Sequence, residues 1–352
     1  MQTGNVLSCI DNGVVYFMPS YTDKKERSIY LVDLDGRSKE PLTIREDGIK
    51  GFKNERLIQF AVSGSNLIVL SNKSIHFFRR DRNSFQVVKT IKNSYSFDHI
   101  EKLGNSFLLH VCYSFHPMDQ TETNLWVKLD MSSLEIGKLF TPEIDNSKFG
   151  SFVNSWVSTY ERTIAHASTS QYKVMFYNDL FLPIDSIELS DELFKLDTGL
   201  INNADLYSKE GISNFMKLDD EKFSRIRKVI MLNSTQVLVF SKLSQEALTD
   251  KGKVRLDMWD KSSGVWRLQL QVAGDEIYKD GETYDDQHTF LGNLYQNVFD
   301  LRISNGQIYC VSFPYYPKVK TESFDRVKDI EASFKDSNEF HYGLEKFVFS
   351  NN

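Results

Sequence analysis

The densest group of chemically active side chains is the segment DEIYKDGETYDDQH, residues 275–288. Its acidic and imidazole residues are Asp275, Glu276, Asp280, Glu282, Asp285, Asp286 and His288. Calcium takes about six to eight oxygen ligands, and these carboxylates offer several. The segment lacks the ligand spacing of an EF-hand loop, however. We therefore interpret it as a solvated acidic loop and a docking surface for a basic partner protein.

The seven histidines form no HxH, HExxH or HxxxH pair, which are spacings that bind metals. His76, His110 and His166 lie in apolar segments, where we expect core residues hydrogen-bonded to neighbouring turns. A metal held by one histidine from each repeat is the alternative, but the three occupy different strand positions. The sequence thus predicts no metal site and no cofactor.

Catalytic motifs are also missing: there is no GxSxG, no P-loop and no dinucleotide fingerprint. Four aspartates recur near the ends of strand-like segments: Asp33, Asp130, Asp257 and Asp260. We interpret them as turn caps, because an Asp side chain accepts hydrogen bonds from backbone amides two residues on. The sequence therefore predicts no catalytic residue and favours a non-enzymatic protein.

The formal net charge of −6 argues against a general nucleic-acid binder, which needs a clustered basic face. Basic clusters at Arg79, Arg80 and Arg82, and at Lys222–Lys228, are interpreted as solvated charges at strand ends. A small-molecule ligand is possible, but no motif indicates one.

The three cysteines, Cys9, Cys112 and Cys310, lie in apolar runs and suit a reducing, intracellular compartment. No segment approaches the about 20 apolar residues of a membrane span. The N-terminus lacks the regions of a secretory signal. Val6–Cys9 is similar to a lipoprotein cleavage box, so a periplasmic or surface lipoprotein anchored through Cys9 is the alternative if the N-terminus was trimmed.

A repeat is the strongest signal in the chain. Pairs of apolar strands joined by short turns recur six times, as in VLSCI-DNG-VVYFMPS, LIQFAVS-GSN-LIVLSN and VFDLRIS-NG-QIYCVSF. Most joints contain Gly, Asn or Ser, which favour hairpin turns. A second hairpin follows most of these pairs, with turns near Gly36, Asn83, Ser133, Asp179 and Ser263. Four antiparallel strands therefore form one unit.

Two stretches interrupt the repeat. Residues 190–221 contain no clean strand pair and predict a helix or long loop, and residues 315–339 include helically spaced SFDRVKDIEASF. The C-terminal EKFVFS is expected to close the ring by pairing strands from both chain ends.

This layout resembles the β-propeller superfamily in the broad sense that includes WD-repeat, kelch and NHL-type proteins. It resembles more faintly the divergent propellers of bacterial surface lipoproteins. The resemblance covers nearly the whole chain but is architectural, because the paired GH and WD signatures and the double-glycine kelch motif are missing. It implies one all-β domain over residues 1–352, with six blades of four strands, seven being possible.

The predicted function is a scaffold that presents rim loops to a partner protein, because propeller blades hold variable loops rigidly. The segments 190–221, 275–292 and 315–339 are the expected contact loops. One alternative is an enzyme that acts on a carbohydrate or other polar substrate at the channel mouth. The other is an extracytoplasmic lipoprotein with a binding role.

Overall fold

The computed structural model confirms an all-β, propeller-like fold built from four-stranded antiparallel sheets. It describes residues 6–19, 27–35, 37–45, 52, 55–71, 74–92, 96–112, 126–140, 156–167, 171–190, 194, 209–244, 254–261, 264–274, 299–304, 307–312 and 343–347. These divide into two compact units. Unit 1 comprises residues 1–91 and 296–352, and unit 2 comprises residues 92–295.

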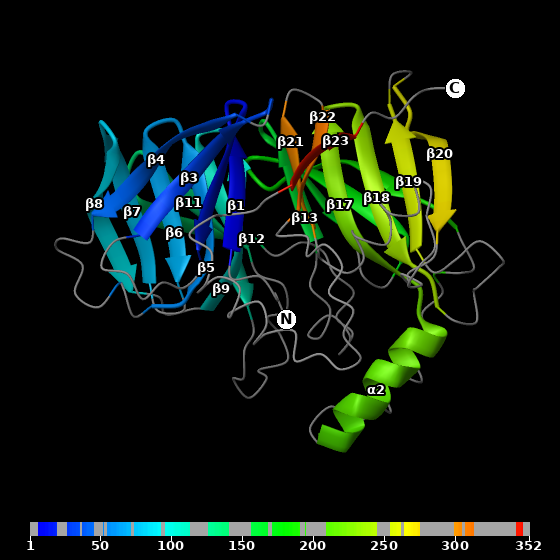
Figure 1. Cartoon of the computed structure of the whole chain (residues 1–352). Coiled ribbons are helices and arrows are strands. Elements are labelled where there is room, and N and C mark those ends of the chain that lie inside the picture. Colours follow the sequence, from blue (N-terminus) through cyan, green and yellow to red (C-terminus); the bar gives the residue numbers. More distant parts are fainter. Residues whose placement is uncertain are drawn as a thin grey trace, which may run out of the picture. The chain divides into compact units, whose positions relative to one another are not determined.

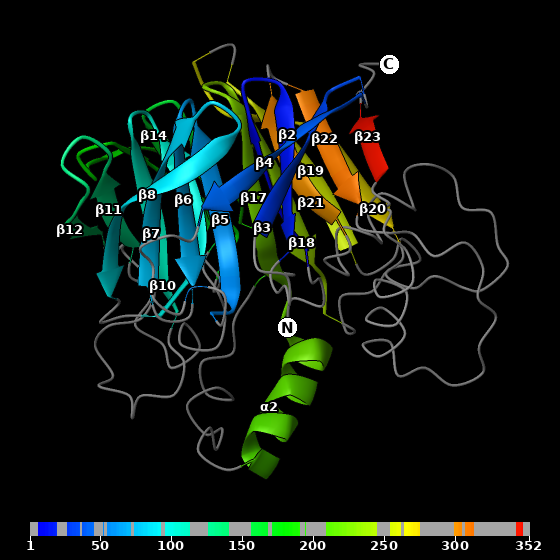
Figure 2. The same ribbon diagram turned by 60° about the vertical axis from the view of Figure 1, so that its left-hand side comes forward.

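Unit 1 contains the first two sheets and the last one (Figures 1 and 2). The first sheet is β1 (Val6–Asp11), β2 (Val14–Pro19), β3 (Arg27–Asp33) and β4 (Ser38–Arg45). The second is β5 (Leu57–Ser63), β6 (Asn66–Ser71), β7 (Ser74–Asp81) and β8 (Ser84–Lys92). The last is β21 (Phe299–Ser304), β22 (Gln307–Ser312) and β23 (Gly343–Phe347).

Unit 2 contains three four-stranded sheets and the helix α2 (Lys209–Lys222). The third sheet of the chain is β9 (Ser96–Leu103), β10 (Ser106–Cys112), β11 (Trp126–Asp130) and β12 (Glu135–Phe140). The fourth is β13 (Trp156–Tyr160), β14 (Thr163–Ala167), β15 (Lys173–Asn178) and β16 (Pro183–Glu188). The fifth is β17 (Arg225–Asn233), β18 (Gln236–Lys242), β19 (Val254–Asp260) and β20 (Arg267–Gly274).

The predicted hairpins are confirmed where the structure describes them. Asn12 and Gly13 both have positive φ, 48° and 72°, as a two-residue hairpin turn requires. The predicted turns at Asn83, Ser133 and Asp179 also form, whereas Gly36, Ser263 and the Asn305–Gly306 pair lie outside the described residues. The described strands form five sheets, the first of which has eight strands. They supply six blade-like groups of strands, and no seventh group occurs among them.

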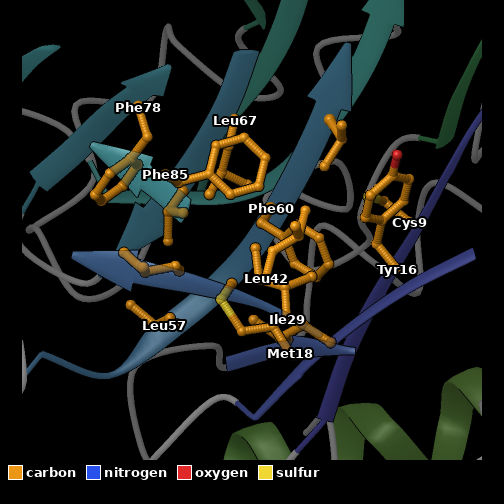
Figure 3. Packing of buried hydrophobic residues seen from close by; sticks show 14 of the residues in the cluster. Cys9, Tyr16, Met18, Ile29, Leu42, Leu57, Phe60, Leu67, Phe78 and Phe85 are labelled. Atoms are coloured by element: carbon orange, nitrogen blue, oxygen red, sulfur yellow. The ribbon is translucent and has the colours of Figure 1, made fainter. Parts of the chain in front are cut away.

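Successive sheets pack through their first strands, as propeller blades do. In unit 1, β1 contacts both β5 and β21, and in unit 2, β13 contacts both β9 and β17. Second strands are therefore buried on both faces, as in β6 and β18, and their sequences read as continuous apolar runs. The core between the first two sheets shows this packing (Figure 3), with Met18, Ile29, Leu42, Phe60, Phe78 and Phe85 in one cluster.

Two features of unit 1 differ from the sequence prediction. The strands β4 and β8 pair in parallel over Thr43–Arg45 and Ser84–Gln86, which joins the first two sheets into one of eight strands (Figure 2). The C-terminal strand β23 forms and pairs with β22, and among the described residues no strand from the N-terminus joins this sheet. Contact between the two chain ends is made instead where β1 packs against β21.

Each four-stranded sheet has tight turns at one end. The first-to-second and third-to-fourth turns share that end because the strands are antiparallel neighbours in chain order. The longer connections leave from the opposite end, including the one that carries α2, which extends beyond the ends of the strands (Figure 1). This helix confirms the insertion predicted at 190–221, whereas 315–339 lies outside the described residues. No helix in the described part of the chain is long and apolar enough to cross a membrane.

Candidate interaction surface

The acidic segment predicted as a contact site, residues 275–288, lies outside the described residues. The histidine prediction can be assessed. His76, His110 and His166 are all buried in strands, with exposed fractions of 0%, 5% and 1%. Among the described residues no group of three or more His, Cys, Asp or Glu side chains is placed to hold a metal ion.

His76 belongs to a buried polar network in unit 1. Its Nε2 lies 2.8 Å from Glu55 Oε2 and its Nδ1 lies 3.1 Å from Thr90 Oγ1. A carboxylate only accepts, so Nε2 carries the proton and Nδ1 accepts from the threonine hydroxyl. Ser71 donates a second hydrogen bond to Glu55. Burial lowers the pKa of His76, although the contact with Glu55 acts in the opposite direction.

Arg27 connects this network to the first sheet. Its guanidinium is buried, donates to the backbone carbonyl oxygen of Glu55 at 3.0 Å and lies 5.1 Å from the centroid of the Phe52 ring. Arg27 begins β3, whereas His76 lies in β7. Glu55 is therefore bound by Arg27 from the first sheet and by His76 from the second, and the network stabilises the fold.

A second buried network lies in unit 2 around Asp257, whose carboxylate is 0% exposed. It accepts from Tyr172 Oη at 2.6 Å, Arg255 Nε at 3.0 Å and Gln271 Nε2 at 2.9 Å. Trp259 Nε1 donates to the Tyr172 hydroxyl at 2.9 Å. Burial, followed by the charge of Asp257, strongly raises the pKa of Tyr172, so the phenol stays protonated.

The turn-cap prediction for Asp257 is therefore wrong. Asp257 lies in the middle of β19, and its partners are side chains rather than turn amides. The prediction is confirmed for Asp33, which accepts from the amides of Asp35 and Arg37, and for Asp130, which accepts from the amides of Ser132 and Ser133. Asp260 accepts from the side chain of Gln236.

His166, in β14 of unit 2, has a strongly lowered pKa. Its Nε2 is buried without a hydrogen-bond partner, and burial, together with the nearby His110, lowers its pKa to about 3. The His110 ring centroid lies 4.8 Å from that of Trp126. Neither histidine is exposed, so neither is placed to act on a substrate from solution.

The described surface of unit 2 carries a group of exposed apolar side chains. Leu180 and Leu182 lie in the β15–β16 turn, Ile184 in β16, Val265 in the β19–β20 turn and Leu268 in β20. Their exposed fractions are 65%, 56%, 55%, 64% and 39% respectively. We call these five residues the apolar outer surface, because β16 and β20 are the last strands of the fourth and fifth sheets.

Asp185 ties the two turns of this surface together. Its Oδ2 accepts hydrogen bonds from Lys261 Nζ and, at 2.8 Å, from Trp266 Nε1. The Trp266 ring stacks on Phe176 with centroids 4.8 Å apart and an angle of 7° between the planes. Burial alone raises the pKa of Asp185, but the hydrogen bonds from Lys261 and Trp266 outweigh burial and hold the pKa below its ordinary value.

Ile184 precedes Asp185, and Val265 precedes Trp266. These contacts therefore hold the backbone at Ile184 and Val265, which lie on neighbouring sheets. An isolated exposed leucine needs no explanation, but a rigid group of apolar side chains on two linked turns is typical of an interaction site. The sequence did not predict this surface, because it depends on contacts between residues 76 to 81 positions apart. The run of leucines around the Asn178–Leu182 turn was its one signal.

No family model matches the chain. No curated protein matches it significantly. Solved structures similar to it include a candidate exported protein from Bacteroides fragilis, with a TM-score of 0.52 and 10% identity, covering 87% of this chain and 78% of that one. They also include a member of the DUF4221 family from Bacteroides vulgatus, with a TM-score of 0.52 and 12% identity, covering 88% of this chain and 86% of that one. At these identities the likeness concerns the fold alone.

Proposed function

We propose that this protein is a non-enzymatic binding module that recognises a partner protein through the apolar outer surface. The observation that supports the proposal is the exposure of Leu180, Leu182, Ile184, Val265 and Leu268 on two turns linked by Asp185. Exposed apolar area is unfavourable in water, and burying it against a partner recovers about 25 cal/mol per Å².

Rigidity makes this surface suited to binding. The side chains stand on four-stranded sheets whose facing residues are buried, so few degrees of freedom are lost on association. The buried polar networks around Glu55 and Asp257 are consistent with a structural use of the protein's ionisable groups. Their central members are hydrogen-bonded to one another and buried, whereas Thr90 and Gln271 are exposed.

Site-specific photo-cross-linking tests the proposal. A benzophenone amino acid replaces Leu182, and the matched control carries it at Val88, which is 49% exposed on β8 in unit 1. Irradiation in the cells that make the protein is expected to give one defined protein adduct from position 182 that position 88 does not give. Adding Leu180→Ser and Val265→Ser is expected to remove that adduct while changing the Tm by no more than about 2 °C. Equal adducts from both positions, or none from position 182, would contradict the proposal.

The acidic segment 275–288 is proposed as a second contact region for the partner. Its support is its charge together with its position after β20, the strand that carries Leu268. Deleting the segment in the photo-probe protein is expected to reduce the adduct yield and leave the Tm unchanged. An unchanged yield would restrict the interface to the apolar outer surface.

Two cellular locations are proposed, each with its own support. The buried thiol of Cys9 suits a reducing compartment inside the cell. The fold likeness to the candidate exported protein of Bacteroides fragilis supports an extracytoplasmic location. Fractionation of the native cells, with the protein detected by antibody, distinguishes the two.

A further inference from the structure

Unit 1 has a charge opposite to that of the whole chain. Its residues 1–91 and 296–352 contain 21 Lys and Arg against 18 Asp and Glu, a net +3, so residues 92–295 carry a net −9. Five of these cations are exposed at the tight-turn end of the first two sheets: Arg37, Lys39, Arg79, Arg80 and Arg82. We call them the cationic turn surface.

Hydrogen bonds bring these residues together. Asn83, next to Arg82 in the β7–β8 turn, donates from Nδ2 to Glu40 on β4 at 3.2 Å, and its carbonyl oxygen accepts from the amide of Thr43 at 3.1 Å. Lys39 adjoins Glu40 in β4. Arg80 Nε donates to the carbonyl oxygen of Arg82 at 3.1 Å. The cations of β7 and the β7–β8 turn thus lie near Lys39 of β4.

In the described part of the chain no ion pair joins these cations to the local carboxylates, whose hydrogen bonds come instead from amide groups. Asp33 accepts from the backbone amide of Arg37, Asp81 from the side-chain amide of Gln86, and Glu40 from that of Asn83. Unit 2 is different. There Lys261 bonds Asp185, Lys173 lies 2.5 Å from Glu188 and Arg162 lies 3.6 Å from Asp179.

Protection of a sheet edge does not explain the cations of β7. Exposed edges often carry Lys or Arg to prevent pairing with another chain. In this fold β7 lies between β6 and β8, so Arg79 and Arg80 are not on an edge strand, whereas Lys39 lies on the part of β4 that does not pair with β8. Exposed cations on an interior strand, without an ion pair among the described residues, indicate a ligand of opposite charge.

We propose that the cationic turn surface binds an acidic polypeptide segment of a partner protein. Guanidinium groups bind carboxylates through paired hydrogen bonds. A nucleic acid fits less well, because it carries a phosphate at every nucleotide and cannot avoid the exposed Asp35, Glu40 and Asp81 that interrupt the cations. A peptide can place neutral residues opposite these carboxylates. In addition, the exposed large apolar residues of the described chain include no aromatic ring on which a base could stack.

Fluorescence anisotropy with a labelled Glu-Gly repeat peptide tests the proposal at low ionic strength. The test variant combines Arg79→Gln, Arg80→Gln and Arg82→Asn, the last because Arg82 has a φ of 53°, which Asn tolerates. The control variant combines Arg45→Gln, Arg56→Gln and Lys92→Gln. It removes the same number of exposed charges, but from the other ends of β4, β5 and β8.

Exposed ion pairs contribute about 0.5 kcal/mol each, so the test variant is expected to bind the peptide about tenfold more weakly and the control less than twofold. A Gln-Gly repeat peptide is expected not to bind. Equal losses in both variants, no saturable binding of the Glu-Gly peptide, or tighter binding of an oligothymidylate would each overturn the proposal. This surface does not depend on the apolar outer surface, so Leu182→Ser is expected to leave peptide binding unchanged whatever the cross-linking result.

Discussion

Burial of His166 predicts an acid-sensitive fold. Its pKa falls from an ordinary value of 6.5 to about 3 in the folded protein, because burial and the nearby His110 disfavour the imidazolium. Between these two values the unfolded chain binds a proton that the folded protein excludes. His166 therefore does not reduce the free energy of unfolding above about pH 6.5. As the pH falls from 6.5 towards 3, the free energy of unfolding decreases by up to about 1.4 kcal/mol per pH unit, and below about pH 3 His166 causes no further decrease.

Replacement by phenylalanine isolates this contribution. Chemical denaturation of the wild type and of His166→Phe between pH 7 and pH 4 is expected to show a shallower decline in the free energy of unfolding for the variant. Proton NMR of the wild type supplies a direct check, since the His166 ring is expected not to titrate above about pH 4. Parallel pH curves for the two proteins would show that His166 is not responsible.

At the residue scale the sequence predicted which side chains are buried better than it predicted which partners they bind. The three strand histidines were predicted to be core residues, and they are, because each lies in an apolar run. Asp257 was wrongly predicted to be a turn cap. Asp260 follows three residues later, and the sequence does not show which of the two aspartates ends the strand. Its partner Tyr172 is 85 residues away, and no local pattern indicates such a distant pair.

At the scale of strands and turns, Asp185 is expected to control the apolar outer surface. Asp185→Ala removes the acceptor for Trp266 Nε1 and the charge that pairs with Lys261. The group is only partly buried, so solvent screening limits the loss to about 1 kcal/mol, a fall in Tm of about 2–4 °C. Hydrogen exchange in the β15–β16 and β19–β20 turns is expected to accelerate, and the cross-link from position 182 to weaken.

Glu188→Gln is the matched control for Asp185→Ala. Glu188 lies on the same strand, and its pair with Lys173 is exposed, with 59% and 33% of the two side chains accessible. An exposed pair contributes little, so this variant is expected to keep the wild-type Tm, exchange rates and cross-link. A similar response of both variants would show that Asp185 does not position the turns.

The strands and short turns were predictable because their signals are local. Alternating burial, as in β3, and turn residues such as Asn12–Gly13 act within about ten residues of each other. The parallel pairing of β4 with β8 was not predictable, because it involves three residues on each strand separated by about 40 positions. The apolar outer surface depends on such non-local contacts, which is why it was missed while the hairpins were found. Arg79, Arg80 and Arg82 were recognised as a basic cluster, but they were interpreted as solvated charges.

At the scale of the whole molecule, unit 1 is built from both ends of the chain. The last sheet, β21–β23, is separated in sequence from the first two by all of unit 2, yet β21 packs against β1. The buried residues Leu7 and Cys9 belong to β1. Unit 1 is therefore expected to need residues 296–352 for its stability, whereas unit 2 is continuous in sequence.

Truncation after residue 295 tests this dependence. Removing three strands and exposing the β1 face is expected to lower the Tm by more than about 10 °C, since each lost kcal/mol lowers the Tm by about 2–4 °C. Hydrogen exchange is expected to accelerate most in β1–β8, with β13–β18 retaining more protection because unit 2 keeps its internal packing. Truncation after residue 347 is the control, because it keeps β23 intact. If the shorter chain instead lost protection equally in both units, they would unfold as one cooperative body, and the last sheet would stabilise the whole molecule rather than unit 1.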